Sequence, residues 1–200
     1  PYDFERRRLS IVVAAGVTPS RHLFITKGAF TNVAAICSGL ERDGRIVPLD
    51  AGHRAELERT VAAKGEEGVR VLAVATREVD IRTDYTRDDE RDMVFRGFLV
   101  FLDPPKADAA RTIHDLHHLG IRIKVISGDN RHVTAHLAKA VGLNAKSMLT
   151  GEELAKLRDE ALWHLAPRPD LFAEIDPQQK ERIVRALQRT GHSVGYLGDG

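Results

Sequence analysis

The sequence predicts an α/β protein in which a parallel sheet with crossover helices follows a smaller α+β module. From about residue 98 onward, strand-like and helix-like segments alternate, as they do when helices join parallel strands. Before that point, short strands separated by turn signals are typical of antiparallel pairing. Two strands run into turns that carry an aspartate, Ser127-Gly128-Asp129 and Gly198-Asp199-Gly200. Acidic turns at the carboxyl ends of parallel strands indicate phosphoryl chemistry.

The first part of the chain is predicted to contain short strands and two helices. Apolar, β-branched runs predict the strands, and apolar residues at helical spacing, such as Leu57 and Val61, predict a helix. Asp43-Gly44 is a hairpin signal between two short runs. The acidic segment 83–92 is predicted to be an exposed loop. The resulting elements are strands over 9–15, 22–27 and 69–76, and helices over 30–38 and 51–64.

A rigid break follows the strand predicted over 94–102. The two prolines of Asp103-Pro104-Pro105-Lys106 can neither continue a central strand nor lie inside a helix, so this segment marks a hinge. We therefore expect two domains, residues 1–97 and residues 98–200. Gly142 and Gly191 are predicted to end two helices of the second domain. Its predicted elements are helices over 107–119, 131–141, 152–165 and 177–190, and strands over 121–126, 171–173 and 193–197.

The composition excludes several classes of protein. The chain is 42% hydrophobic and 30% charged with a net charge of +1, which gives no electrostatic case for a nucleic-acid partner or an anionic membrane surface. The single cysteine, Cys37, excludes an internal disulfide and is expected to be a buried helix residue rather than a nucleophile. No apolar run reaches the roughly 18 to 20 residues of a spanning helix, and the opening residues lack the pattern of a signal peptide. We expect a cytoplasmic protein, or the soluble segment of a larger membrane protein.

Two features of the second domain are suited to binding phosphate. In Ser127-Gly128-Asp129, a hydroxyl, a flexible glycine and a backbone NH can bind a phosphoryl oxygen, and the next helix points its positive end at the same place. A plain strand-to-helix turn would use the same residues. Lys180 lies in the first turn of a predicted helix, where a positive charge is slightly unfavourable. This conflict indicates a phosphate ligand, and a solvated surface lysine is the alternative.

Three further segments are candidates for ligand contacts. Asp199 is a candidate Mg²⁺ ligand, although Asp-Gly also suits a type I′ hairpin. Lys27-Gly28-Ala29 would allow close approach to a phosphate or a base, or would simply join a strand to a helix. Phe4 is suited to stacking on a base that Arg6 contacts, or to packing in the core beside a basic run. The sequence has no Gly-rich phosphate loop, and its histidines lack the spacing of a zinc site.

The order of these segments resembles that of the cytoplasmic motifs of P-type ATPases. The segments are Phe4-Glu5-Arg6, Lys27-Gly28-Ala29, Arg70, Asp103-Pro104-Pro105-Lys106, Ser127-Gly128-Asp129, Lys180 and Gly198-Asp199-Gly200. The resemblance covers the whole chain, and residues 3–10, 101–106 and 180–184 make it most similar to the bacterial magnesium-transporting ATPases. It implies the C-terminal part of a nucleotide-binding domain over 1–97, and a partial haloacid-dehalogenase-like phosphorylation domain over 98–200.

The resemblance implies a role for each candidate residue. The implied nucleotide contacts are adenine stacking by Phe4, a nucleotide contact by Arg6, an adenine pocket lined by Lys27 and Gly28, a phosphate contact by Arg70, and proximity of Asp103 to bound ATP. The implied catalytic contacts are the holding of the phosphoryl group by Ser127, Gly128 and Asp129, neutralisation of its charge by Lys180, and binding of the catalytic Mg²⁺ by Asp199.

The chain departs from the family pattern in three respects. Ser127 replaces the usual threonine and keeps its hydroxyl, whereas Leu9 replaces a lysine that some relatives have. The Asp-Lys-Thr-Gly-Thr motif that carries the phosphorylated aspartate is absent, as is the Asn-Asp expected after Gly200. The resemblance therefore implies a fragment, cut through a functional loop, that binds ATP at most. Loss of the first, central strand would leave exposed sheet edges that favour self-association.

For the intact protein, the resemblance implies a pump that couples ATP hydrolysis to magnesium transport at the cytoplasmic face of the inner membrane. Its partners would be ATP, Mg²⁺ and the rest of the pump, including transmembrane helices outside this chain. Two other functions are compatible with the residues. A soluble phosphatase of the haloacid dehalogenase superfamily would share Ser127, Lys180 and Asp199, and a nucleotide-binding module would lack catalysis.

Overall fold

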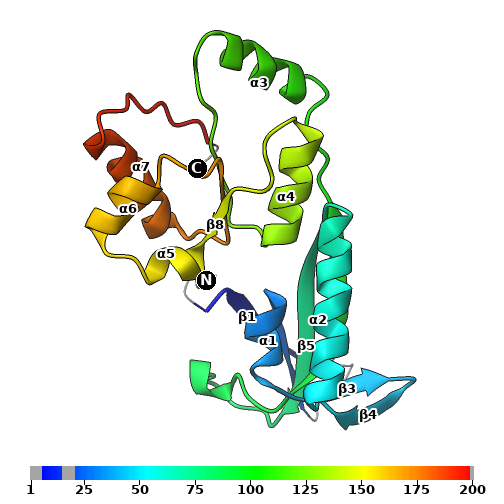
Figure 1. Cartoon of the computed structure of the whole chain (residues 1–200). Coiled ribbons are helices and arrows are strands. Elements are labelled where there is room, and N and C mark those ends of the chain that lie inside the picture. Colours follow the sequence, from blue (N-terminus) through cyan, green and yellow to red (C-terminus); the bar gives the residue numbers. More distant parts are fainter. Residues whose placement is uncertain (1–5, 15–20, 199–200) are drawn as a thin grey trace. The chain divides into compact units, whose positions relative to one another are not determined.

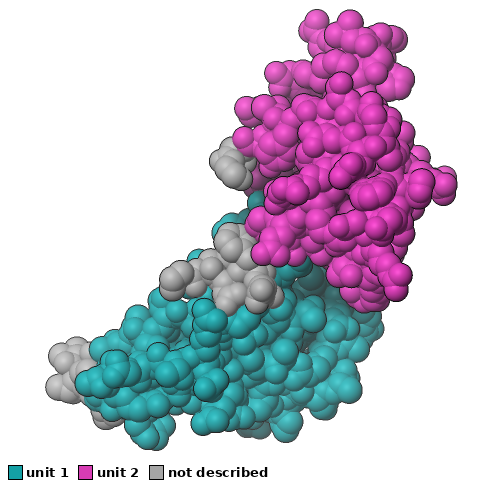
Figure 2. Space-filling view, turned by 90° about the vertical axis from the view of Figure 1, so that its left-hand side faces the viewer, with its two compact units in different colours: residues 1–64, 69–101 teal, residues 65–68, 102–200 magenta. Residues whose placement is uncertain are grey.

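The computed structural model describes residues 6–14 and 21–198 (Figure 1). The chain divides into two compact units, which Figure 2 shows in teal and magenta. Unit 1 comprises residues 1–64 and 69–101, and unit 2 comprises residues 65–68 and 102–200. Each unit has its own sheet and its own buried core. Across the described ranges, no helix has both the length and the apolar character that a membrane crossing requires.

Unit 1 is built on a six-stranded mixed sheet in the order β1-β2-β5-β6-β3-β4. Its strands are β1 (Arg8–Ala14), β2 (His22–Gly28), β3 (Cys37–Arg42), β4 (Arg45–Pro48), β5 (Val69–Val79) and β6 (Met93–Leu102). β1 pairs antiparallel with β2, and β2 pairs antiparallel with β5, whereas β3 runs parallel to β6. The antiparallel pairing predicted for this part of the chain is therefore present, and β3 adds one parallel pair that was not predicted.

The connection between β3 and β4 is a two-residue hairpin. Arg42 pairs with Arg45, and the two residues between them, Asp43 and Gly44, have positive φ angles of 51° and 74°. A type I′ turn needs a positive φ at both central residues, and Asp-Gly adopts this conformation at low cost. The hairpin predicted from Asp43-Gly44 is confirmed.

Two helices join strands of unit 1 (Figure 1). α2 (Ala51–Glu66) lies where a helix is predicted and packs Leu57 and Val61 against the core. α1 (Phe30–Ala34) is shorter than the helix predicted over 30–38. The prediction is wrong beyond Ala34 because Cys37 starts β3 and pairs with Met93 of β6. That strand partner lies far along the chain and leaves no local signal.

Cys37 is buried, as expected, but in a strand rather than in a helix. Its Sγ donates a hydrogen bond to the Val33 carbonyl at 3.2 Å, and burial raises the pKa of the thiol to about 11. Because the thiolate is the reactive species, we expect Cys37 in the folded chain to be almost inert toward iodoacetamide at mildly alkaline pH. Mass spectrometry should detect fast labelling only in denaturant. Rapid labelling of the folded chain would contradict the buried position.

Unit 2 contains a three-stranded sheet in the order β7-β9-β8. Its elements are α3 (Ala109–His118), β7 (Val125–Ile126), α4 (Arg131–Ala140), β8 (Met148–Thr150), α5 (Gly151–Ala155), α6 (Asp159–Leu165), β9 (Leu171–Ala173) and α7 (Pro177–Arg189). Both strand pairs are parallel, and helices connect successive strands. The predicted parallel sheet with crossover helices is therefore confirmed in the described residues.

Several bounds in unit 2 differ from the prediction. The strand predicted over 121–126 is only two residues long, residues 193–197 form no strand, and β8 is not among the predicted strands. The helix predicted over 152–165 is divided into α5 and α6. At the break, Arg182 of α7 donates hydrogen bonds to the Leu157 carbonyl at 3.0 Å and to the Asp159 carboxylate at 2.7 Å. A distant arginine thus stabilises an interruption that the local sequence does not require.

Capping residues fix the helices that follow β8 and β9. Thr150 opens a capping box with Glu153, and Asp176 opens another with Gln179. Pro177 occupies the first turn of α7, where its missing NH removes no helical hydrogen bond. The starts of α5 and α7 are therefore well defined at the carboxyl edge of the sheet. The core beneath them consists of Leu149, Leu154, Leu162, Ala166, Phe172, Ile175, Ile183, Ala186 and Leu187.

Candidate functional site

One face of the unit 1 sheet carries two of the predicted ligand-binding residues. Leu9 of β1 pairs with Lys27 of β2, and Lys27 pairs with Val74 of β5, so these three side chains share a face. Arg70 lies on the same face, because it is an even number of residues from Val74 along β5. Lys27 and Arg70 are exposed, whereas Leu9 and Val74 are half-buried. Lys27 therefore lies between two half-buried apolar side chains, and Arg70 lies further along β5 on the same face. This arrangement suits a ligand with a flat apolar part and an anionic part.

Gly28 lies on the opposite, buried face of β2, where β1 comes very close. A Cβ atom on Gly28 would collide with the Arg7 carbonyl oxygen and would lie 2.7 Å from the Arg8 Cα. Ala29 donates a backbone hydrogen bond to the same Arg7 carbonyl at 3.0 Å. In this structure the close approach that Gly28 permits is that of β1. Its contact with a ligand stays a prediction of the resemblance.

Gly28→Ala is expected to destabilise unit 1 by about 1 to 3 kcal/mol, because the colliding atoms belong to the backbone and cannot rotate away. Urea denaturation followed by circular dichroism measures the change. The matched control is Gly52→Ala in α2, where a Cβ would meet only the Asp50 Oδ1 atom at 3.4 Å. Alanine should stabilise that helix by about 0.5 to 1 kcal/mol. Equal stability of the Gly28→Ala variant and the parent would contradict the close packing of β1 on β2.

The Arg6 side chain is bound to a buried acidic residue that the sequence does not indicate. Arg6 and Arg8 both donate to Oε2 of Glu90, with the Arg8 Nε atom 2.7 Å away. Glu90 is only 7% exposed, as is its neighbour Asp89, so the exposed loop predicted over 83–92 is wrong at these two residues. Phe4 lies outside the described residues, and its stacking on a base stays a prediction.

The predicted phosphate-binding turn of unit 2 lies between β7 and α4. The Ser127 hydroxyl donates to Oδ2 of Asp129 at 3.0 Å and accepts a hydrogen bond from the Asp129 backbone NH at 3.1 Å. The Asn130 side chain caps α4 by accepting from the NH groups of His132 and Val133, each at 3.0 Å. The turn thus presents a hydroxyl and a carboxylate beside the start of a helix, where the backbone dipole favours anions.

The parallel topology brings Lys180 to the same edge of the sheet. Because β7 and β9 are parallel neighbours, Ser127 and Glu174 both follow the carboxyl end of a strand. The Glu174 NH donates to the Asp129 carbonyl at 2.8 Å, and the Ile175 NH donates to the Ser127 carbonyl at 3.0 Å. Lys180 lies in the first turn of α7, directly after this connection, and is half-buried. The structure therefore gathers the turn and Lys180 at one edge.

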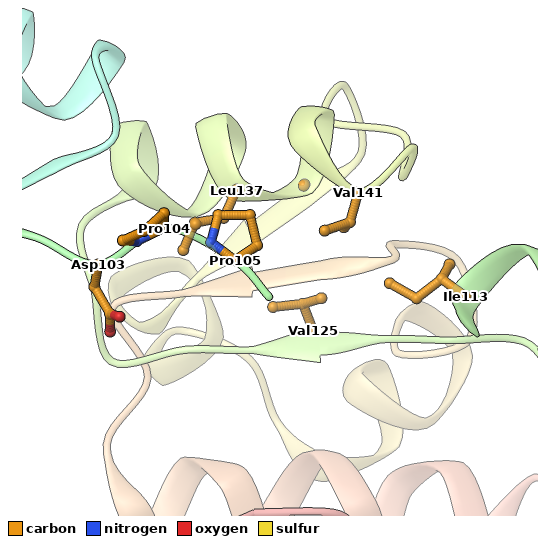
Figure 3. Close-up of a pocket in the computed structure, with 8 residues that line it drawn as sticks. Asp103, Pro104, Pro105, Ile113, Val125, Leu137 and Val141 are labelled. Carbon is orange, nitrogen blue, oxygen red and sulfur yellow. The ribbon is translucent and has the colours of Figure 1, made fainter. Parts of the chain in front are cut away.

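Asp103 borders an apolar hollow of about 320 Å³ within unit 2. Figure 3 shows Pro105 between Leu137 of α4 and Val125 of β7, with the Asp103 carboxylate directed away from the prolines. Apolar walls give this hollow no means of binding a phosphate, so the hollow does not account for the predicted nucleotide contact of Asp103. The residues that line the hollow are Asp103, Pro104, Pro105, Ile113, Val125, Leu137, Ala138 and Val141.

The residues at the edge of the unit 2 sheet include oxygen donors suited to magnesium. Within residues 6–14 and 21–198, no group of three or more His, Cys, Asp or Glu side chains could hold a metal ion. Mg²⁺, however, often uses one or two carboxylates together with waters and substrate phosphates. The Asp129 carboxylate and the Ser127 hydroxyl supply such donors, so the residue set fits Mg²⁺ bound together with a phosphate. Asp199, the predicted ligand, lies outside the described residues.

Comparison with known proteins identifies related sequences along the whole chain. Residues 1–108 match a family model described as P-type ATPase, cytoplasmic domain N. The whole chain is 41% identical over 201 residues to magnesium-transporting ATPase, P-type 1, of Escherichia coli strain K12. It is 37% identical over 203 residues to a protein of the same name from Salmonella typhimurium strain LT2. Over 87% of the chain, it is 34% identical to the cation-transporting ATPase pma1 of Synechocystis sp..

The chain is much shorter than these relatives. It spans 22% of the length of the Escherichia coli and Salmonella proteins and 20% of the Synechocystis protein. The family model nevertheless covers more than half of the chain, and the two magnesium-transporting relatives align with all of it. The resemblance inferred from the order of the motifs is confirmed, and the chain belongs to the P-type ATPase family.

Proposed function

We propose that this chain is a cytoplasmic part of a longer P-type ATPase that couples ATP hydrolysis to magnesium transport. The observation that carries the proposal is the 41% identity, over the whole chain, to a magnesium-transporting ATPase. Identity to the Synechocystis cation-transporting ATPase is lower, at 34%. The longer protein would carry its transmembrane helices outside this chain and would present the chain at the cytoplasmic face of the inner membrane.

In this proposal, residues 1–97 are the C-terminal part of the nucleotide-binding domain. The shared face of β1, β2 and β5 supports it, because Lys27 lies between the half-buried Leu9 and Val74, and Arg70 lies further along β5. Adenine would lie on this face beside Lys27, between Leu9 and Val74, with Phe4 stacked on it. Gly28, whose Cα faces the buried side, would contribute only its backbone to the adenine pocket. Arg70 would reach the phosphates, for which a guanidinium is well suited.

Residues 98–200 would be a haloacid-dehalogenase-like phosphorylation domain. Ser127, Gly128 and Asp129 would hold the transferring phosphoryl group, Lys180 would neutralise its charge, and Asp199 would bind Mg²⁺, which supplies further charge neutralisation when bound. In the described part of the chain, β7 is an edge strand of the sheet. We propose that a strand outside this chain, which carries the phosphorylated aspartate, pairs with β7. The chain alone would then bind ATP without hydrolysing it.

Calorimetric titration of the chain with ATP, with and without Mg²⁺, tests the nucleotide-binding part of the proposal. Phe4→Ala and Lys27→Ala are each expected to weaken ATP binding by about tenfold, because one removes a stacking platform and the other a cation. Arg189→Ala is the control, since the Arg189 guanidinium lies over the Trp163 ring in unit 2. Absence of ATP binding by the folded chain would contradict this part, and hydrolysis of small phosphoesters would favour the phosphatase instead.

Growth of a bacterial strain that lacks magnesium uptake tests the transport part of the proposal. The full-length protein is expected to restore growth at low magnesium, and the chain alone is not. Supplementing the medium with another divalent cation is the control for ion specificity. Failure of an expressed, ATP-hydrolysing full-length protein to restore growth would contradict magnesium uptake.

A further inference from the structure

Glu90 is a buried carboxylate to which neither the family motifs nor the proposed function gives a role. Its side chain is only 4% exposed. Oε2 accepts hydrogen bonds from Arg6 and from Nε of Arg8, and Oε1 accepts one from the Ser10 hydroxyl at 2.7 Å. Burying a charge is costly unless it is paired and hydrogen-bonded. Here both oxygens accept hydrogen bonds, and two of the three donors are arginine side chains, so the burial of Glu90 is compensated.

The backbone on both sides of Glu90 is fixed. Thr86 and Asp89 form a capping box around the 3₁₀ turn Arg87–Asp89, which ends directly before Glu90. Shortly after it, β6 begins at Met93, whose side chain is fully buried. The carboxylate is therefore presented from a well-defined position and not from a loop that follows its partners.

Glu90 also connects three segments of unit 1. Arg8 donates a second hydrogen bond to the Asn32 carbonyl of α1 at 3.2 Å, and Ser10 shares one with the Thr26 hydroxyl of β2 at 2.8 Å. The β1–β2 register that places Arg8 opposite Gly28 also places Leu9 opposite Lys27 on the other face. The same carboxylate thus holds Arg6 and the strand that carries one side of the proposed nucleotide face.

We propose that Glu90 is a positioning residue that holds the Arg6 guanidinium in place for the anionic part of a nucleotide. This inference rests on the proposed function, in which Arg6 contacts the nucleotide. A long arginine side chain loses rotamer freedom when it binds a ligand, and fixing the side chain beforehand removes part of that cost. A guanidinium presents its NH donors in a rigid plane that matches the geometry of a phosphate, so the orientation of the plane decides how well it binds one.

A double-mutant cycle in the 200-residue chain tests this inference, with calorimetry of ATP and of adenosine. Arg6→Ala and Glu90→Gln are each expected to raise the Kd for ATP by about tenfold. The Kd of the double variant should not exceed the larger of these two values, because both substitutions remove the same contact. Adenosine lacks phosphates, so all three variants should bind it like the parent. Glu56→Gln is the matched control, because the Glu56 side chain lies on α2, outside the sheet, and is 53% exposed. This control should leave the affinity for both ligands unchanged.

The outcomes separate this inference from the proposed function. If Arg6→Ala does not weaken ATP binding, the proposed nucleotide contact of Arg6 is wrong, and the role of Glu90 is wrong with it. If Arg6→Ala weakens ATP binding but Glu90→Gln does not, or if the two losses multiply, only the positioning role is overturned. Equal losses for ATP and adenosine would indicate a general disturbance of unit 1 and would also overturn it.

A second variant covers the case in which Glu90→Gln does not fold. Ser10→Ala keeps the charge of Glu90 and removes only the 2.7 Å hydrogen bond to Oε1. A loss of affinity of about threefold, confined to ATP, would support the positioning role. An unchanged affinity of the folded Ser10→Ala variant for ATP would overturn it.

Discussion

ATP hydrolysis by the full-length protein is expected to fall by about 10²- to 10³-fold when Lys180 is replaced by alanine, because removing one preorganised charge from a transition state typically has an effect of this size. The affinity for ATP should change little. In the proposed function ATP binds mainly through unit 1, whereas Lys180 lies in unit 2. A large loss in kcat at an unchanged Kd for ATP is therefore the expected signature.

The same substitution should not weaken the fold. Lys180 lies in the first turn of α7, where a positive charge opposes the helix dipole at a cost of about 0.3 to 1 kcal/mol. Alanine also has a higher helix propensity than lysine. Denaturation of the chain should therefore give Lys180→Ala a free energy of unfolding equal to or slightly above that of the parent. A residue that lowers stability yet is required for turnover is placed for function rather than for folding.

Lys156→Ala is the matched control for Lys180. The Lys156 side chain is 69% exposed and forms an ion pair with Glu152, one helical turn away, at 2.7 Å. An exposed pair of this kind contributes little, so the control should leave both stability and ATP hydrolysis nearly unchanged. Hydrolysis by the Lys180→Ala protein at a rate near that of the parent would show that Lys180 is an ordinary surface lysine.

The parts of the fold with local chemical signals could be predicted from the sequence. The helix predicted over 177–190 is α7, because Asp176 and Gln179 form a capping box at its start and Gly191 follows it with a φ angle of 82°. The hairpin at Asp43-Gly44 follows from the same kind of signal. In each case the residues that decide the structure lie within a few positions of one another, so no distant partner is needed.

The features that depend on distant partners could not be predicted. α1 stops early because Cys37 joins β6, and α5 separates from α6 where Arg182 binds the Leu157 carbonyl. Glu90 is buried beside partners from the start of the chain, Arg6, Arg8 and Ser10. An acidic segment such as 83–92 is by itself typical of an exposed loop. These partners are distant in the sequence and meet only in the folded chain, so the residues near each position do not indicate them.

The same distinction applies to the candidate site. The turn at Ser127-Gly128-Asp129 could be located because a strand followed by a glycine and a polar residue has a local signal. The common face of Leu9, Lys27 and Val74 could not be located in this way. It depends on the register of β1, β2 and β5, and that register is known only once the strands have paired. Strand length was overestimated in unit 2 because apolar content does not say whether a partner strand is present, as residues 193–197 illustrate.

Replacing Gly151 by alanine is expected to destabilise unit 2 by about 3 kcal/mol. A Cβ atom here would collide with the Glu174 carbonyl oxygen and would lie 2.7 Å from Oε1 of Gln179. The carbonyl belongs to the backbone, so relief requires movement of the chain that leaves β9. The Gly151 carbonyl also accepts a hydrogen bond from Nε2 of Gln179 at 2.9 Å. The same movement would therefore disturb the capping box at the start of α7.

Thermal denaturation of Gly151→Ala and of its control, Gly195→Ala, measures this effect. A Cβ atom on Gly195 would meet no atom within 4 Å, so the control should keep the Tm of the parent. Because Lys180 follows the disturbed capping box, ATP hydrolysis by the full-length Gly151→Ala protein should also fall, while ATP binding through unit 1 persists. Equal Tm values for the two variants would show that the segment after β9 can move away from the new Cβ atom at little cost in stability. The position of Lys180 would then not depend on the packing around Gly151.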